Sequence, residues 1–257
     1  MNTPLPKAKK SLGQHFLVDH HYIDRIVAAI HPRADDTLVE IGPGPGALTR
    51  PLLDTLKHLH VVEFDRDMVA RLKEEFPGER LTIHQADALE FDFGQFGEGL
   101  RVVGNLPYNI SSPLLFHLAE SAGLIRDMCF MLQKEVVDRM AAAPDTPDYG
   151  RLSVMLQARF QVRKLFVVPP GAFRPPPKVD SAIVRLLPLP LAEVPYRNAR
   201  VFADVVARAF GQRRKTLRNT LKGLVDAAVF EELGIDPVRR GETLSVAEFA
   251  RLANRLS

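Results

Sequence analysis

The run Gly-Asn-Leu-Pro-Tyr at 104–108 places a side-chain amide, a backbone carbonyl and an aromatic ring within one bend. The side-chain oxygen of Asn105 and the carbonyl of Leu106 can accept both N–H bonds of an exocyclic amino group, such as that of adenine. Drawing these bonds out of the ring plane exposes the nitrogen lone pair, an electrostatic effect on the transition state. Tyr108 can stack on the ring, which contributes ~1–3 kcal/mol per base in nucleic-acid sites. The same residues also fit an ordinary turn that closes a strand.

A glycine-rich loop follows a short apolar run at 38–49. A loose form of the dinucleotide fingerprint G-x-G-x-x-G/A is satisfied by Gly42, Gly44 and Ala47. This pattern leaves both a nicotinamide cofactor and S-adenosylmethionine open. Two details favour the second: Glu40 precedes the first glycine and can face a cationic methionine end, and Gly46 opens the loop for a bulky amino acid.

Two further acids follow apolar runs. Glu63 ends the run at 60–64, about 20 residues after the glycine loop, where an acid can bind ribose hydroxyls. Asp87 follows the run at 81–84 and can accept a hydrogen bond from an adenine amino group. Asp87 fits the N-cap of a helix as well.

The chain alternates between two patterns. Strand-like runs lie at 37–41, 59–64, 81–84, 101–104 and 127–132, and helical patterns lie at 22–31, 46–57, 66–76, 112–120 and 134–142. This alternation predicts an α/β fold with a parallel, doubly wound sheet, whose ligands bind at the carboxyl ends of the strands. Four candidates stand at such ends: Gly42, Glu63, Asp87 and Asn105. We expect them to meet at one edge of the sheet.

Composition sets broad limits. A chain of 257 residues with 46% hydrophobic content suits one large α/β domain and one small domain. The single cysteine, Cys129, lies in an apolar run and predicts a buried thiol in a reducing compartment. No secretory signal and no apolar run of about 20 residues is visible, so a cytoplasmic protein is expected. Apart from the pairs His58/His60 and His20/His21, the eight histidines lack metal-ligand spacing, so no metal is expected.

A basic segment follows the proline-rich stretch at 188–195, which predicts a domain boundary. Between 197 and 222 one acid, Asp204, stands among Arg197, Arg200, Arg208, Arg213, Arg214, Lys215, Arg218 and Lys222. This imbalance favours binding to a phosphate backbone. The alternative is a solvated helix face.

Eight motifs in order resemble those of the bacterial small-subunit (16S) ribosomal RNA adenine dimethyltransferases, of the rRNA adenine N6-methyltransferase family. They lie at 10–19, 40–46, 62–65, 85–88, 104–113, 149–154, 169–181 and 209–219. The first resembles the family's N-terminal lid, and the next three resemble its cofactor motifs. One departure is His15, where many relatives carry Asn.

The resemblance implies a Rossmann-like, seven-stranded methyltransferase sheet with a small C-terminal helical domain. Strands near 162–168 and 180–187 complete the seven. Residues 1–190 are expected to form the S-adenosylmethionine-binding catalytic domain, and 191–257 the helical RNA-binding domain. The implied reaction transfers methyl groups to N6 of two adjacent adenosines near the 3′ end of small-subunit ribosomal RNA. The implied setting is a monomer that acts on a pre-30S particle during small-subunit biogenesis.

The resemblance also implies a set of site residues. The catalytic residues are Asn105, Leu106, Tyr108 and Phe173, with Phe173 facing Tyr108 across the target base. The cofactor contacts are His15, Leu17, Glu40, Gly42, Gly44, Glu63, Asp87 and Asn105, where His15 donates to the methionine carboxylate. The RNA contacts are Arg208, Arg213, Arg214, Lys215 and Arg218.

Two rival functions remain. One is an antibiotic-resistance methyltransferase that acts on a single adenine of large-subunit RNA. The run at 175–181 and the basic motif at 209–219 favour the small-subunit enzyme over this rival. The other is an assembly factor that binds immature small subunits and for which methylation is secondary.

Overall fold

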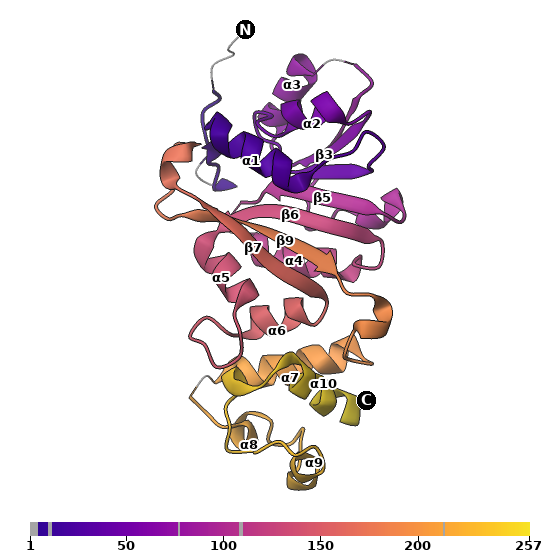
Figure 1. Ribbon diagram of the computed structural model, residues 1–257, viewed down its shortest axis with the longest axis vertical. Helices are drawn as coiled ribbons and strands as arrows, with labels where there is room; N and C mark the ends of the chain where they lie inside the picture. The colour runs from indigo at the N-terminus through magenta and orange to yellow at the C-terminus, as the bar shows by residue number, and fades with distance from the viewer. Residues whose placement is uncertain (1–4, 10–11, 77, 108–109, 213) are drawn as a thin grey trace. The chain divides into compact units, whose positions relative to one another are not determined.

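The computed structural model describes residues 5–9, 12–76, 78–107, 110–212 and 214–257 (Figure 1). The chain forms two compact units. The first comprises Met1–Val137 and Arg163–Pro188, and the second comprises Asp138–Val162 and Leu189–Ser257. This division differs from the expected boundary at 190, because Tyr149, Val154 and Ala158 pack into the core of the second unit.

The first unit holds a seven-stranded sheet in the order β4-β3-β2-β5-β6-β9-β7. Its strands are β2 (Leu38–Ile41), β3 (Leu59–Glu63), β4 (Leu81–Gln85), β5 (Leu100–Asn105), β6 (Ile125–Gln133), β7 (Phe160–Val168) and β9 (Ser181–Pro188). The strands from β4 to β6 run parallel, and β9 pairs antiparallel with β6. The predicted seven-stranded sheet of an α/β fold is therefore confirmed.

The helices of this unit are α1 (His20–Ile30), α2 (Thr49–Thr55), α3 (Arg66–Glu75), α4 (Ser111–Glu120) and the 3₁₀ turns η2 (Phe93–Phe96) and η3 (Pro170–Ala172), with α5 (Lys134–Ala141) crossing the unit boundary. Side-chain caps fix where two of them begin: Asp19 accepts from the His21 amide and Asp65 from the Asp67 amide. A second, two-stranded sheet pairs β1 (Phe16–Leu17) with β8 (Phe173–Arg174). It ties the segment before α1 to the loop after η3.

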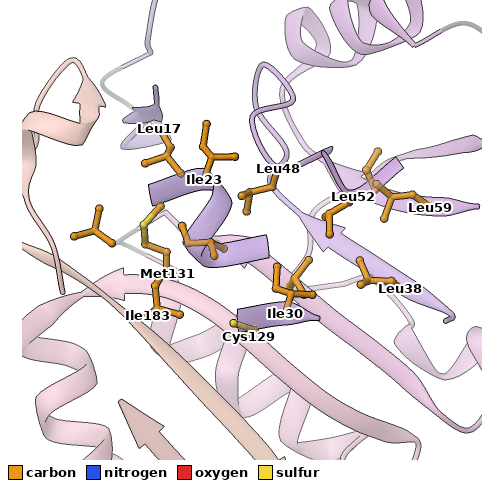
Figure 2. Packing of buried hydrophobic residues seen from close by; sticks show 14 of the residues in the cluster. Leu17, Ile23, Ile30, Leu38, Leu48, Leu52, Leu59, Cys129, Met131 and Ile183 are labelled. Carbon is orange, nitrogen blue, oxygen red and sulfur yellow. The ribbon is translucent and has the colours of Figure 1, made fainter. Parts of the chain in front are cut away.

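The core of the first unit lies where α1 and α2 meet the sheet. Figure 2 shows Ile30 of α1 beside Cys129 of β6, in the cluster that also contains Ile23, Met131 and Ile183. Cys129 is buried in the same cluster, as predicted, and burial raises the pKa of its thiol to about 12. Such a thiol is an inert core residue at neutral pH.

A buried ion network lies at the amino ends of β5 and β6. The Arg101 guanidinium donates to Asp127 Oδ1 at 2.6 Å and Oδ2 at 2.9 Å, and to Asp36 Oδ2 at 2.6 Å. All three side chains are at most 9% exposed. Arg126 and Arg185 add outer contacts to the two carboxylates, each at 3.0 Å. The guanidinium thus neutralises two carboxylates that are largely shielded from solvent.

The second unit is helical. It contains α6 (Arg151–Gln157), α7 (Ala199–Gly211), α8 (Leu217–Thr220), α9 (Ala227–Glu232) and α10 (Val246–Arg255), with short 3₁₀ turns at η4 (Leu191–Glu193) and η5 (Gly241–Thr243). A capping box of Ser245 and Glu248 starts α10. The Tyr149 hydroxyl donates to the Leu244 carbonyl at 2.9 Å, which joins the α6 region to the start of α10. In the described part of the chain, no helix is long and apolar enough to cross a membrane.

Candidate functional site

A cavity of about 220 Å³ opens at the carboxyl ends of the first unit's parallel strands. Five segments line it: the N-terminal segment at 12–17, the glycine loop at 40–45, the end of β3 at 62–64, the loop at 86–88, and the asparagine turn at 105–107. Gly42, Glu63, Asp87 and Asn105 meet here, at the sheet edge where the strand pattern placed them. This is where ligands bind in doubly wound sheets.

Two glycines are required by the backbone around this cavity. Gly44 adopts φ +53, a left-handed conformation that other residues rarely adopt, and its amide donates to Glu63 Oε2 at 3.3 Å. Gly104, whose role the sequence did not reveal, packs β5 against β2. A Cβ on Gly104 would lie 2.3 Å from the Ile41 carbonyl oxygen. Glycine therefore permits the turn at residue 44 and the close approach of β5 to β2 at residue 104.

Glu40 lies next to the end of β2 as a buried acid, with only 2% of its surface exposed. The Thr49 hydroxyl, at the start of α2, donates to its Oε2 at 2.7 Å. Burial raises the pKa of Glu40 to about 7, and the nearby charge of Glu63 adds to the shift. Near neutral pH, Glu40 therefore changes between a neutral and a charged form.

Glu63 is held in place by backbone amides. Its Oε1 accepts from the Asp65 amide at 2.8 Å and its Oε2 from the Gly44 amide at 3.3 Å. Burial raises its pKa, and the two amide contacts oppose that shift. An ionised carboxylate has about four lone-pair directions, so this fixed group keeps acceptor capacity for hydroxyls in the cavity.

Asp87 lies on the cavity wall in a turn rather than at a helix end. Its Oδ1 accepts from the Leu89 amide at 2.9 Å. Asp87 thus makes the side-chain contact of an N-cap residue, but it does so in an Asx turn that no helix follows.

The asparagine turn is oriented by its neighbours. Asn105 Nδ2 donates to the His15 carbonyl at 3.1 Å, which directs Oδ1 away from that carbonyl. The Leu106 amide donates to the Met131 carbonyl at 3.1 Å, and the Leu106 side chain is buried. The Pro107 carbonyl accepts from the Ile110 amide and the Ser111 hydroxyl. Tyr108 lies outside the described residues.

Phe173 is buried and is not among the described residues that line the cavity. Its side chain is 0% exposed and packs in the core cluster that also contains Leu17. In the β1–β8 pairing, Leu17 lies opposite Phe173, and both side chains are buried in this cluster. A ring without exposed surface cannot stack on a base unless this segment moves. Leu17 itself lines the cavity, as expected.

His15 also lines the cavity, and its ring is engaged by the chain. Nδ1 lies 2.9 Å from the Pro175 carbonyl oxygen and must donate, because a carbonyl only accepts. In a neutral imidazole, Nε2 is then an acceptor. Donation from Nε2 to a cofactor carboxylate would therefore require a protonated ring.

The sequence did not reveal a polar contact between the N-terminal segment and the loop after β3. Lys9 Nζ lies 2.6 Å from Asp65 Oδ1 and 2.7 Å from Asp67 Oδ2. Gln14 Nε2 donates to Asp65 Oδ2 at 3.0 Å. Next to this contact, Phe64 is 60% exposed and lines the cavity. The position of Phe64 directly after Glu63, the acid at the end of β3, was the sequence feature that could have indicated its place in the cavity wall.

The expected RNA contacts belong to the second unit. Arg214, Lys215 and Arg218 are exposed, at the connection of α7 to α8 and in α8 itself. Arg208 is half-exposed and pairs with Asp204 at 3.0 Å. Arg213 lies outside the described residues. Arg208 therefore has an intramolecular partner that an RNA phosphate would have to displace.

Comparison with known proteins covers nearly the whole chain. A model of the family described as ribosomal RNA adenine dimethylase matches residues 5–257. The ribosomal RNA small subunit methyltransferase A of Aromatoleum aromaticum is 61% identical over 251 residues, which cover 98% of this chain and 95% of the relative. The protein of the same name from Thiobacillus denitrificans is 60% identical over 257 residues, which cover 100% of this chain and 99% of the relative.

Two solved structures are similar throughout. A dimethyladenosine transferase from Plasmodium falciparum has a TM-score of 0.81 at 28% identity, and the match covers 93% of this chain and 96% of that one. The 23S rRNA methyltransferase ErmE has a TM-score of 0.70 at 27% identity, with coverage of 94% and 99%.

Proposed function

The chain belongs to the ribosomal RNA adenine dimethylase family, and we propose that it methylates N6 of two adjacent adenosines near the 3′ end of small-subunit ribosomal RNA. It is an S-adenosylmethionine-dependent enzyme. The observation that carries the proposal is the asparagine turn at the cavity, whose amide is held with its oxygen available as an acceptor.

The cavity suits this cofactor. Among its described lining residues are three carboxylates, Glu40, Glu63 and Asp87, and no lysine or arginine. Such a wall fits a ligand with a cationic sulfonium, an ammonium and ribose hydroxyls. We assign Glu63 to the hydroxyls, Glu40 to the methionine end and Asp87 to the adenine amino group. When bound, the cofactor supplies the methyl group.

The chain's own part in the reaction is to prepare the target nitrogen. Asn105 Oδ1 and the Leu106 carbonyl accept the two N–H bonds of the adenine amino group. The lone pair is then no longer shared with the ring, and the growing positive charge on nitrogen is stabilised by both oxygens. A base inside a duplex cannot reach these oxygens, so it must be single-stranded or flipped out.

The small subunit is favoured over the large subunit by the relatives. Those named small subunit methyltransferase A are 56–61% identical, whereas the 23S enzyme is 27% identical. We further propose that the chain acts as a monomer on a pre-30S particle in the cytoplasm. Purified protein with cofactor tests the choice of substrate directly. It should form N6,N6-dimethyladenosine in unmethylated small subunits and not in large subunits.

Removing the ribose acceptor should weaken cofactor binding. We expect Glu63→Ala to lower affinity for S-adenosylhomocysteine by ~1–3 kcal/mol, because two hydroxyls lose a charged acceptor. Isothermal calorimetry measures this, with Asp54→Ala, an exposed acid of α2, as the control. Equal affinity in wild type and Glu63→Ala would refute the assignment.

Glu40 should make stability and cofactor affinity depend on pH. Its pKa is about 7 in the folded protein against 4.5 normally, so the folded state binds the extra proton between these values. The stabilisation from this group is complete below pH 4.5 and is lost as the pH rises to about 7. Glu40→Gln should gain stability relative to wild type across this window, as denaturant titrations will measure.

The charged form of Glu40 is the one that attracts an ammonium. S-adenosylhomocysteine affinity of the wild type should therefore rise more steeply with pH, through about 7, than that of Glu40→Gln. Parallel pH profiles for the two proteins would contradict the proposed role.

Substrate binding and chemistry should be separable. We expect the triple variant Arg214→Glu, Lys215→Glu and Arg218→Glu to bind small subunits ~10–100-fold more weakly. The slope of log affinity against log salt should shrink by somewhat under ~1 for each phosphate that is no longer neutralised. S-adenosylhomocysteine affinity should not change, because none of the three lines the cavity.

The matched control for this triple variant reverses the charge of three exposed basic residues of the first unit, Arg33, Lys57 and Lys73, by substitution with Glu. If the first triple variant keeps the affinity and salt slope of the wild type, the segment is only a solvated face.

A further inference from the structure

His15 contacts two loops that are far apart in the sequence. Its main-chain carbonyl accepts from Asn105 Nδ2 at 3.1 Å, and its imidazole Nδ1 donates to the Pro175 carbonyl at 2.9 Å. The partners lie 90 and 160 positions further along the chain. One residue therefore bridges the asparagine turn and the loop that carries Phe173.

We propose that His15 is a positioning residue, which holds the Asn105 amide in its reactive orientation through the imidazole contact with the Pro175 carbonyl. The proposal rests on the proposed function, because the reactive orientation is defined by the adenine amino group. His15 acts through Asn105 and through the backbone, and it need not touch the adenine.

The backbone next to His15 shows how the imidazole contact reaches Asn105. Phe16 pairs with Arg174 and Leu17 with Phe173 in the β1–β8 ladder. The Val18 and Asp19 amides donate to the Ala172 carbonyl at 2.9 and 3.3 Å. The imidazole contact with Pro175 lies one residue beyond the last pair of this ladder, Phe16 with Arg174. It involves the same residue whose carbonyl accepts from Asn105. Loss of the imidazole contact removes one of the interactions that hold the His15 peptide beside the loop at 172–175.

The position of that carbonyl decides which way the Asn105 amide faces. While the carbonyl accepts from Nδ2, Oδ1 faces away and is available to an amino group. A displaced carbonyl would allow the amide to turn over and present N–H donors to the N–H bonds of the substrate. Removal of the imidazole contact should therefore lower the rate of methyl transfer even when the cofactor is saturating.

The two ring nitrogens can be distinguished by substitution. Nδ1 is two bonds from Cβ, as Nδ2 of asparagine is, whereas the amide nitrogen of glutamine lies one bond further out, near the position of Nε2. His15→Asn can therefore still donate to the Pro175 carbonyl. His15→Gln keeps a polar group near Nε2 but not near Nδ1, and His15→Ala has neither. His20→Ala, an exposed position of α1, is the control.

The first measurement is hydrogen exchange in the peptides that contain Val18 and Asp19, which requires neither cofactor nor RNA. His15→Gln and His15→Ala should exchange faster than wild type, and His15→Asn should restore slow exchange. The second is single-turnover methylation of small subunits. The rate should fall roughly 10–100-fold in the Gln and Ala variants and recover with Asn. Calorimetry with S-adenosylhomocysteine measures any loss of cofactor affinity separately, so that the single-turnover rates are compared at saturating cofactor.

Three results would overturn the proposal. Wild-type exchange in all three variants would show that the imidazole contact does not anchor the segment. Recovery with Gln and not with Asn would assign the role to Nε2. Faster hydrogen exchange together with an unchanged rate of methylation would show that His15 anchors the segment without positioning Asn105. If the wild type does not methylate small subunits, the proposed function fails, and the exchange data still decide whether the contact anchors the segment.

Discussion

The Asn105→Ala enzyme is expected to bind S-adenosylhomocysteine almost as the wild type does and to methylate bound RNA ~10²–10³ times more slowly. The side-chain oxygen is one of two acceptors proposed to free the lone pair of the adenine amino group. That oxygen is already oriented by the contact of Nδ2 with the His15 carbonyl, so the protein reorganises little as the reaction proceeds. Single-turnover kinetics at saturating enzyme isolates the chemical step.

Asn105→Asp separates orientation from acceptor strength. Aspartate has two acceptors, but a carboxylate cannot donate to the His15 carbonyl and is repelled by it. We expect it to be impaired as well, whereas Gln95→Ala, which removes an exposed amide in η2, should behave as wild type. A wild-type rate for Asn105→Ala with RNA bound would end the proposed role of this side chain.

Arg101→Met should lower the free energy of unfolding by ~3–5 kcal/mol. The substitution keeps an apolar chain of similar length but leaves Asp36 and Asp127 buried without their central cation. Arg126, which is 48% exposed and contacts the same Asp36, provides the matched control. Arg126→Met should cost no more than about 1 kcal/mol, as exposed ion pairs do.

Urea denaturation of both variants measures this difference. Folded Arg101→Met should still bind S-adenosylhomocysteine, because the network lies at the amino ends of the strands and the cavity at their carboxyl ends. A drop in stability below about 1 kcal/mol for Arg101→Met would show that the two acids find other partners or take up protons.

Local pattern was enough to predict the sheet and the position of the site. Each predicted strand is present within about three residues, because apolar runs bounded by glycine, proline and polar residues leave few alternatives. Gly42, Glu63, Asp87 and Asn105 meet at one cavity because the carboxyl ends of parallel strands share an edge of the sheet. Their convergence follows from strand direction alone.

Contacts between distant segments could not be predicted in this way. Phe173 is buried in a cluster with Leu17, with which it pairs from more than 150 positions later in the chain, and no local pattern encodes that pairing. The packing of 149–158 in the second unit depends in the same way on side chains beyond residue 200. The contacts of Lys9 and Gln14 with Asp65 join segments 56 and 51 positions apart.

The most direct test of the central claim is mass spectrometry of small-subunit ribosomal RNA from cells that lack this gene. Two adjacent adenosines near the 3′ end should carry no methyl groups in these cells. Wild-type protein should restore N6,N6-dimethyladenosine at both positions, and Asn105→Ala should restore little at equal abundance. Full dimethylation of both adenosines in cells without the gene, or new methylation confined to large-subunit RNA when it is supplied, would contradict the account.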